Sequence, residues 1–113
     1  MVIGDFASHL AGISATVESK TVGNDNYFVI SGVTISSGTN AGKTCDVAIK
    51  QSTANPWVPE SAVHVRPHLV PMGQRSSQGS PLGGDWQYLS RRFERAPTPR
   101  NLYAHILTVL GEL

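Results

Sequence analysis

The sequence contains a single cysteine, Cys45, among its 113 residues. One cysteine can form neither an internal disulfide bond nor a cysteine-rich zinc site, so both kinds of framework are excluded. A chain of this length without such supports is expected to depend on one hydrophobic core, and a reducing compartment suits it. We therefore expect a single domain over residues 1–113, located in the cytoplasm.

The sequence also lacks an excess of charge of either sign. Nine lysines and arginines oppose eight aspartates and glutamates, which leaves a net charge of +1. Proteins that bind nucleic acid or membrane surfaces usually have a strong basic bias, so this balance disfavours both classes. No long apolar run opens the chain, because Asp5 and His9 interrupt it, and we expect neither a signal peptide nor a membrane span.

Helical spacing of apolar residues occurs at the two ends of the chain. Ile3, Phe6 and Leu10 predict a short amphipathic opening helix. Near the other end, Thr98 is a suitable N-cap and Pro99 suits the first helical turn. The residues that follow form the apolar stripe of a closing amphipathic helix: Leu102, Ile106, Val109, Leu110 and Leu113.

Between these helices, alternating apolar and polar residues predict four antiparallel strands. The predicted strands lie at 13–18, 27–35, 44–50 and 61–65, and a Gly-Asn-Asp-Asn turn separates the first two. In the third of them, Cys45, Val47 and Ile49 face the core. From Pro67 to Asp85 the chain is rich in proline, glycine and serine, which predicts a long loop. The fold class is therefore α+β, with a four-stranded meander and a helix at each end.

Three patterns imitate functional motifs. Residues 38–44 resemble a phosphate-binding loop, but Ser37 stands where its first glycine belongs and a strand is expected after Lys43, so a hairpin loop is predicted. His64 and His68 have the spacing of a helical metal site, yet about 13 Å separates such residues on an extended chain, so we interpret them as surface or loop histidines. Cys45 shares its strand face with apolar residues and is interpreted as a buried hydrophobe rather than a nucleophile.

A proline-flanked corner, Asn55-Pro56-Trp57-Val58-Pro59, lies between the third and fourth predicted strands. Two prolines this close fix a turn between strands, and Trp57 beside them is expected to be packed in that corner. The series of opening helix, meander, proline corner, long loop with a tryptophan near its end and closing helix resembles the ubiquitin-conjugating enzyme fold. This resemblance covers most of the chain and implies a UBC-like domain with a flap-type loop at about 67–85.

The departures from that family concern its chemistry. Where the family has a His-Pro-Asn segment, this chain has Arg66-Pro67-His68, and no cysteine follows Cys45. Thioester transfer requires a thiolate, and the family uses the missing asparagine to support the oxyanion. The resemblance therefore implies a non-catalytic variant without catalytic residues, cofactor or metal, whose partner is another protein, such as a ubiquitin-like protein or a component of its conjugation machinery.

The predicted partner-binding residues combine aromatic rings with arginines: Trp86, Tyr88, Arg91, Arg92 and Arg95. An open alternative is that the aromatic rings belong to the core and the arginines form a solvated face. Two other functions also remain as alternatives. One is an active transferase of a ubiquitin-like modifier that uses Cys45. The other is an anion or nucleic-acid binding module that uses the arginine cluster, although nucleic acid is an unlikely partner.

Overall fold

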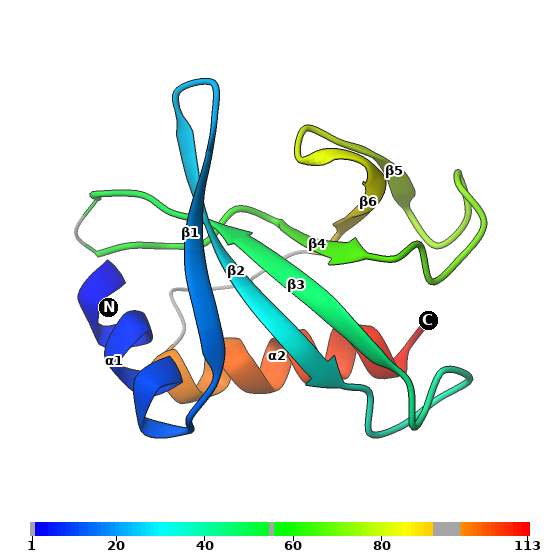
Figure 1. Ribbon diagram of the computed structural model, residues 1–113, viewed down its shortest axis with the longest axis horizontal. Helices are drawn as coiled ribbons and strands as arrows, with labels where there is room; N and C mark the ends of the chain where they lie inside the picture. The colour runs from blue at the N-terminus through cyan, green and yellow to red at the C-terminus, as the bar shows by residue number, and fades with distance from the viewer. Residues whose placement is uncertain (1, 55, 92–97) are drawn as a thin grey trace.

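The alternating segments assemble into one antiparallel sheet, described here from a computed structural model (Figure 1). The structure describes residues 2–54, 56–91 and 98–113. In the described part the elements are α1 (Ile3–Gly12), β1 (Thr16–Val22), β2 (Asp25–Thr34), β3 (Thr44–Lys50), β4 (Ala62–Arg66), β5 (Ser77–Ser80), β6 (Gly83–Ser90) and α2 (Pro99–Gly111). The six strands lie in the order β1-β2-β3-β4-β6-β5.

The α+β class, both helices and the four predicted strands are confirmed, but the strand number is not. The sheet has six strands rather than four, because the predicted loop at 67–85 contains β5 and the first residues of β6. The sequence of β5, Ser-Gln-Gly-Ser, has no apolar alternation. Its strand character comes from backbone pairing with β6, which composition cannot reveal.

The boundary of the first strand also differs from the prediction. β1 begins at Thr16, whereas the alternation suggested residue 13. Ser14 has a positive φ of 58°, so the chain turns there on leaving α1 and cannot yet be extended. Ala15 and Val17 are nevertheless packed against the main core, as their spacing suggested.

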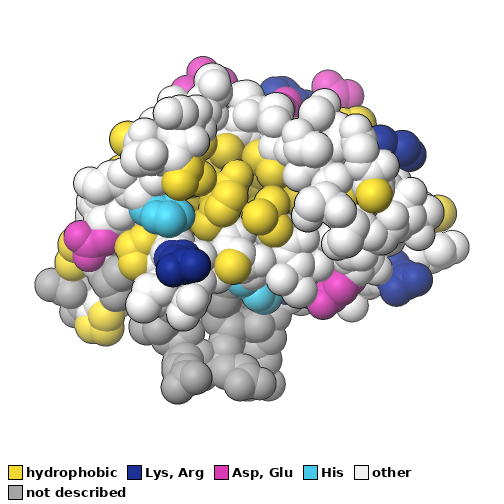
Figure 2. Space-filling model, turned by 90° about the horizontal axis from the view of Figure 1, so that it is seen from below, with side chains coloured by type: hydrophobic (Ala, Val, Ile, Leu, Met, Phe, Trp, Pro, Cys, Tyr) yellow, Lys and Arg dark blue, Asp and Glu magenta, His cyan; other side chains and the backbone are white. Residues whose placement is uncertain are grey.

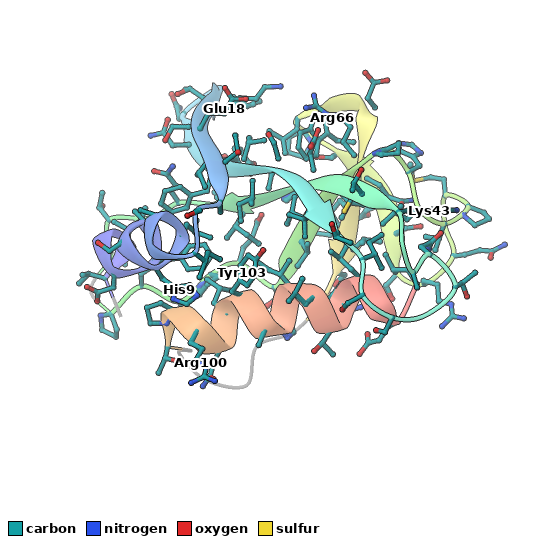
Figure 3. The ribbon with its side chains drawn as sticks, turned by 60° about the horizontal axis from the view of Figure 1, so that its bottom comes forward. His9, Glu18, Lys43, Arg66, Arg100 and Tyr103 are labelled. Atoms are coloured by element: carbon teal, nitrogen blue, oxygen red, sulfur yellow. The ribbon has the colours of Figure 1, made fainter. Side chains whose placement is uncertain are left out.

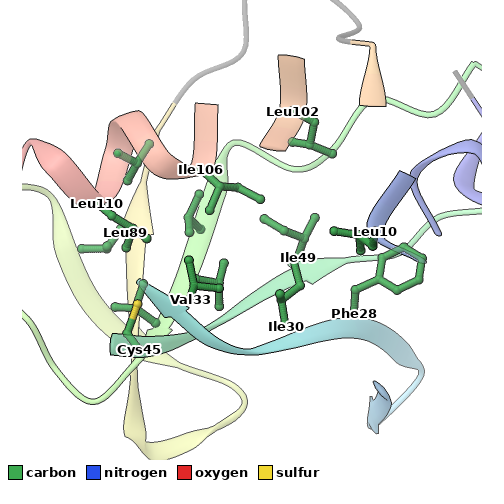
Figure 4. Close-up of a cluster of buried hydrophobic side chains, with 14 of the residues drawn as sticks. Leu10, Phe28, Ile30, Val33, Cys45, Ile49, Leu89, Leu102, Ile106 and Leu110 are labelled. Carbon is green, nitrogen blue, oxygen red and sulfur yellow. The ribbon is translucent and has the colours of Figure 1, made fainter. Parts of the chain in front are cut away.

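Both helices cover the same face of the sheet (Figure 1). Their apolar stripes pack on alternate residues of β2, β3 and β4, and Figure 4 shows Leu102, Ile106 and Leu110 of α2 directed at the strands. Trp57 of the proline corner is fully buried against Phe6 and Phe28, with ring centroids 5.9 and 6.3 Å apart. The prediction of a packed corner is confirmed for this tryptophan, while Asn55 lies outside the described residues.

A smaller cluster lies on the other face of the sheet, on which neither of the two described helices packs. It is made of Tyr27, Val29, Ala48, Leu82 and Trp86, each less than 10 % exposed. Leu82 reaches it because the turn between β5 and β6 is held by Lys20 of β1, whose Nζ donates to the Leu82 carbonyl over 3.4 Å. The middle of β3 is therefore buried on both faces, and Ala48 is as inaccessible as Val47.

Residues 69 and 70 are fastened to the helix-covered face by one buried side chain. Gln87 of β6 is fully buried; its Nε2 donates to the Val70 carbonyl over 2.7 Å, and its Oε1 accepts from the Leu69 amide at 3.1 Å. A buried amide that satisfies several backbone groups fixes a segment without regular hydrogen bonding. The segment before β5 is accordingly held in a defined position against the sheet.

The residues 38–44 that imitate a phosphate-binding loop connect β2 with β3, and a strand follows Lys43 as expected. This loop touches the end of α2 at a glycine. Gly38 has φ +82°, and a Cβ added there would overlap the carbonyl group of Gly111. Gly42, in the same loop, has a similar φ of +87° but no atom within 4 Å of such a Cβ.

We therefore expect Gly38→Ala to lower the free energy of unfolding by about 3 kcal/mol, since strain in φ adds to a backbone overlap with α2. Gly42→Ala is the matched control. It should lower the free energy of unfolding only by the cost of a positive φ in alanine, about 1.5 kcal/mol. Urea denaturation followed by circular dichroism measures both. Equal decreases in the free energy of unfolding would mean that the close approach of Gly38 to α2 does not limit the residue at position 38.

Candidate functional site

The face of the sheet on which no described helix packs, called the open face below, carries a group of paired polar and ionisable side chains. Strand pairing places Val29, Ala48, His64 and Tyr88 in one row across β2, β3, β4 and β6. A neighbouring row brings Asp46 opposite Arg66. Figure 3 shows Arg66 and Glu18 on the side of the sheet away from α2, while Arg100 and Tyr103 lie on the α2 side.

His64 is at the centre of this face, and its placement corrects the prediction of a surface histidine. The side chain is 1 % exposed. Its Nε2 lies 2.7 Å from Glu60 Oε1 and its Nδ1 lies 2.8 Å from Ser80 Oγ. The rings of Tyr27 and Tyr88 meet it edge-on at centroid distances of 5.4 and 5.2 Å. A buried imidazole is tolerated here because both ring nitrogens have partners.

The three polar groups form a directional chain. When Glu60 accepts the Nε2 proton, Nδ1 is left with a lone pair that accepts the Ser80 hydroxyl proton. Ser80 Oγ in turn accepts from the Leu82 amide over 3.2 Å. Burial raises the pKa of Tyr27 beside this chain, with smaller contributions from the charges of Glu60 and Asp25. This order of carboxylate, imidazole and hydroxyl is the one that polarises a serine.

Arg66 is a partly exposed cation of the open face. Its Nε and Nη2 both donate to Asp46 Oδ2, at 3.0 and 2.8 Å, and its guanidinium carbon lies 4.7 Å from the centroid of the Trp86 ring. Its side chain is nevertheless 41 % exposed. Stacking and pairing therefore hold this arginine in one orientation while part of its donor fork still faces solvent.

The predicted partner-binding residues divide between two places. Trp86 is 2 % exposed beneath Arg66, and Tyr88 is half-buried against His64, so both belong to the open face. Arg91 lies past the end of β6, where it donates to the carbonyls of Arg75 and Ser90 and approaches Glu112 at 3.5 Å. Arg92 and Arg95 lie outside the described residues. Whether any of the five binds a partner stays a prediction.

Sequence reasoning missed Glu60, Ser80 and Arg66 as neighbours of these aromatic rings. A signal for Arg66 existed, because His64 and Arg66 alternate on one strand as Trp86 and Tyr88 do on another. It becomes useful only once β6 is known to pair with β4. Ser80 offered no such signal, since it lies in a serine-rich and glycine-rich stretch.

Cys45 lies on the helix-covered face, among the core residues (Figure 4). It is 3 % exposed, as predicted for a buried hydrophobe. Burial, and secondarily the charge of Asp46, raises the pKa of its thiol from the ordinary 9.0 to about 11. Very little thiolate therefore exists at neutral pH.

Two hollows lie away from the open-face chemistry. One, of about 360 Å³, is beside the tip of the β1–β2 hairpin and includes Lys50 and Gln51. The other, of about 400 Å³, lies between the end of α1, β2 and α2 and includes Ile13, Tyr103 and Leu107. Seen from the α2 side, hydrophobic side chains gather near the centre of the surface (Figure 2). Neither hollow is lined by Glu60, His64 or Ser80.

Comparison with protein-family models, curated protein sequences and solved structures gave no significant match. Within the described residues, no helix combines the length and apolar character that crossing a membrane requires. No group of three or more His, Cys, Asp or Glu residues in the same part of the chain is arranged to hold a metal ion.

The Cys45 thiol should react slowly in the folded protein. At pH 8, below both values, a pKa near 11 instead of 9.0 lowers the thiolate fraction about 100-fold, and burial slows access further. We expect iodoacetamide to label the native protein at least 100-fold more slowly than the protein in guanidinium. Native labelling within a few-fold of the denatured rate would instead identify a reactive thiol.

Proposed function

We propose that this domain is a non-catalytic protein of the conjugating-enzyme-like type, which binds another protein through its open face. The order of α1, the β1–β4 meander and the Trp57 corner agrees with the resemblance seen in the sequence. The addition of β6 and β5 to the sheet is a difference from the four-stranded form. The proposal is therefore supported by the open face more than by the architecture.

The observation that carries the proposal is Arg66 stacked on Trp86 and paired with Asp46. Arginine and aromatic residues are the most frequent energetic anchors of protein interfaces. An anchor already held in one conformation loses little side-chain entropy when a partner binds. The absence of thioester chemistry is supported by Cys45, the only thiol in the sequence, which is buried and protonated at neutral pH.

Arg66→Ala tests the binding function against Arg100→Ala, a control that removes the same charge from α2 on the other side (Figure 3). Isotope-labelled protein is titrated with ubiquitin, and with small ubiquitin-like modifiers, while amide chemical shifts are followed. We expect shifts confined to β3, β4 and β6, and about ten-fold weaker binding for Arg66→Ala, as for an interface anchor. Trp86→Ala should also weaken binding, whereas Arg100→Ala and Cys45→Ala should not.

Two results would contradict this proposal. Equal weakening by Arg66→Ala and Arg100→Ala would indicate non-specific attraction by net charge. Unchanged open-face signals with every modifier would exclude this class of partner for the face. Circular dichroism of each variant separates loss of binding from loss of folding.

A second candidate function follows from the Glu60–His64–Ser80 chain, whose polarity suits activation of a hydroxyl. In this function His64 Nδ1 takes the Ser80 proton while Oγ attacks the carbonyl carbon of an activated ester. The bond to the leaving group breaks, the leaving group receives the proton, and the acyl group remains on Oγ until water releases it by the same steps.

A fluorophosphonate probe distinguishes the two functions, because it phosphonylates only an activated serine and releases fluoride. The second candidate predicts labelling at Ser80 that is lost in Ser80→Ala and slowed about 100-fold in His64→Gln, in line with the contribution of a general base. Ser90→Ala is the matched control, since Ser90 is an exposed serine on β6. Absence of labelling would mean that the Glu60–His64–Ser80 hydrogen bonds have a structural role only, and it would exclude this candidate function.

A further inference from the structure

We propose that β1 is a pairing edge for a second copy of this chain, with two β1 strands antiparallel about Ser19 so that two sheets become one. This surface is separate from the open-face anchor on β4 and β6, so the inference does not depend on the proposed function.

β1 is an accessible edge. It is the first strand in the sheet order and, among the described strands, pairs with β2 alone. The four residues from Glu18 to Thr21 are all exposed. Figure 1 shows the β1–β2 hairpin extending beyond the rest of the sheet, so the outer side of β1 is not covered there by α1.

The backbone groups that face outwards can be assigned from one hydrogen bond. Gln51 N donates to the Asn26 carbonyl over 2.7 Å, so the backbone groups of Asn26 face β3. Because successive residues of a strand alternate in direction, the residues of β1 opposite Asn26 and Phe28 direct their groups away from β2. These residues are Thr21 and Ser19, and Val17 follows by the same alternation.

An antiparallel copy centred on Ser19 matches this set of free groups. It places Ser19 opposite Ser19, and Val17 opposite Thr21 on either side, with about six intermolecular backbone hydrogen bonds. Registers centred on Glu18 or Lys20 also place free groups opposite free groups, but over residues 17–21 each makes fewer hydrogen-bonded pairs and places two like charges opposite each other. The number of pairs and the charges together therefore select the register centred on Ser19.

The charges of β1 match the same register. Glu18 of one copy lies opposite Lys20 of the other, twice, in positions where side chains are closest in an antiparallel pair. Charged residues on an edge strand ordinarily block pairing. Here residues of opposite charge flank the two-fold axis, so this register places opposite charges opposite each other. Registers centred one residue away in either direction would place Glu18 opposite Glu18 or Lys20 opposite Lys20. Glu18 makes no hydrogen bond or ion pair with another described residue, which leaves its carboxylate available.

The expected dimer is weak. Seven residues extend about 24 Å, and a strand pair of this length buries less area than a standard stable interface. We expect a dissociation constant between about 10 µM and 1 mM at low salt. Opposite charges at the centre should make association weaker as salt increases.

Sedimentation velocity from about 10 µM to 2 mM tests this inference. Wild-type protein should show a monomer–dimer equilibrium, and Glu18→Lys should weaken it about ten-fold or more, because two Lys–Lys pairs replace two ion pairs. The exchanged variant Glu18→Lys/Lys20→Glu should dimerise again, since the complementary pattern returns. Because this variant also loses the hydrogen bond from Lys20 to the Leu82 carbonyl, circular dichroism first establishes that it is folded. Wild-type protein that stays monomeric throughout, or an exchanged variant no better than Glu18→Lys, would overturn the inference.

A cross-link tests the register independently. Ser19→Cys places two thiols on the two-fold axis, where Cα atoms about 5.5 Å apart permit a disulfide bond. Thr21→Cys is the matched control, because its copies lie four residues apart along the strands, beyond disulfide reach. Under mild oxidation we expect dimers from Ser19→Cys alone. Equal cross-linking of both variants would exclude this register, and Cys45 does not interfere because it is buried.

Discussion

The antiparallel pairing of β4 with β6 determines most of what is distinctive in this molecule. It brings His64 beside Tyr88, and the next residues along each strand bring Arg66 over Trp86. On the opposite face of the sheet, β6 carries Gln87, whose side chain bonds the backbone of residues 69 and 70. One strand pair thus organises the open face, anchors the segment before β5 and completes the core. A change in the position of β6 would therefore alter contacts on both faces of the sheet.

The two faces of the sheet have different physical roles. The helix-covered face is an aliphatic and aromatic core in which Trp57, Phe6 and Phe28 close one end. The other face keeps a small apolar cluster under a layer of polar side chains that pair with one another, such as Arg66 with Asp46 and His64 with Glu60. The Arg66–Asp46 pair is oriented there without being fully desolvated, which is a suitable condition for recognition.

The two edges of the sheet also differ. β5 has only four residues, and its register with β6 is irregular near Ser80, both of which discourage further pairing. β1 has seven residues in regular register with β2 and an accessible outer side. A protein that simply avoided association would be expected to protect both edges. This asymmetry is the physical basis for the proposal that β1 pairs with a second copy of the chain.

The sequence by itself determined the elements whose side chains alternate between solvent and core: both helices, the strands up to β4, the buried Cys45 and the packed Trp57. Local periodicity encodes which side of an element is apolar, and that is enough to place these residues. Only the tertiary structure decided that a polar stretch pairs as β5, that His64 is buried with Glu60 and Ser80, and that Arg66 rather than Arg91 accompanies Trp86. Those facts depend on which strands become neighbours, and neighbours across a sheet are chosen by the packing of the whole chain rather than by the spacing of residues along it.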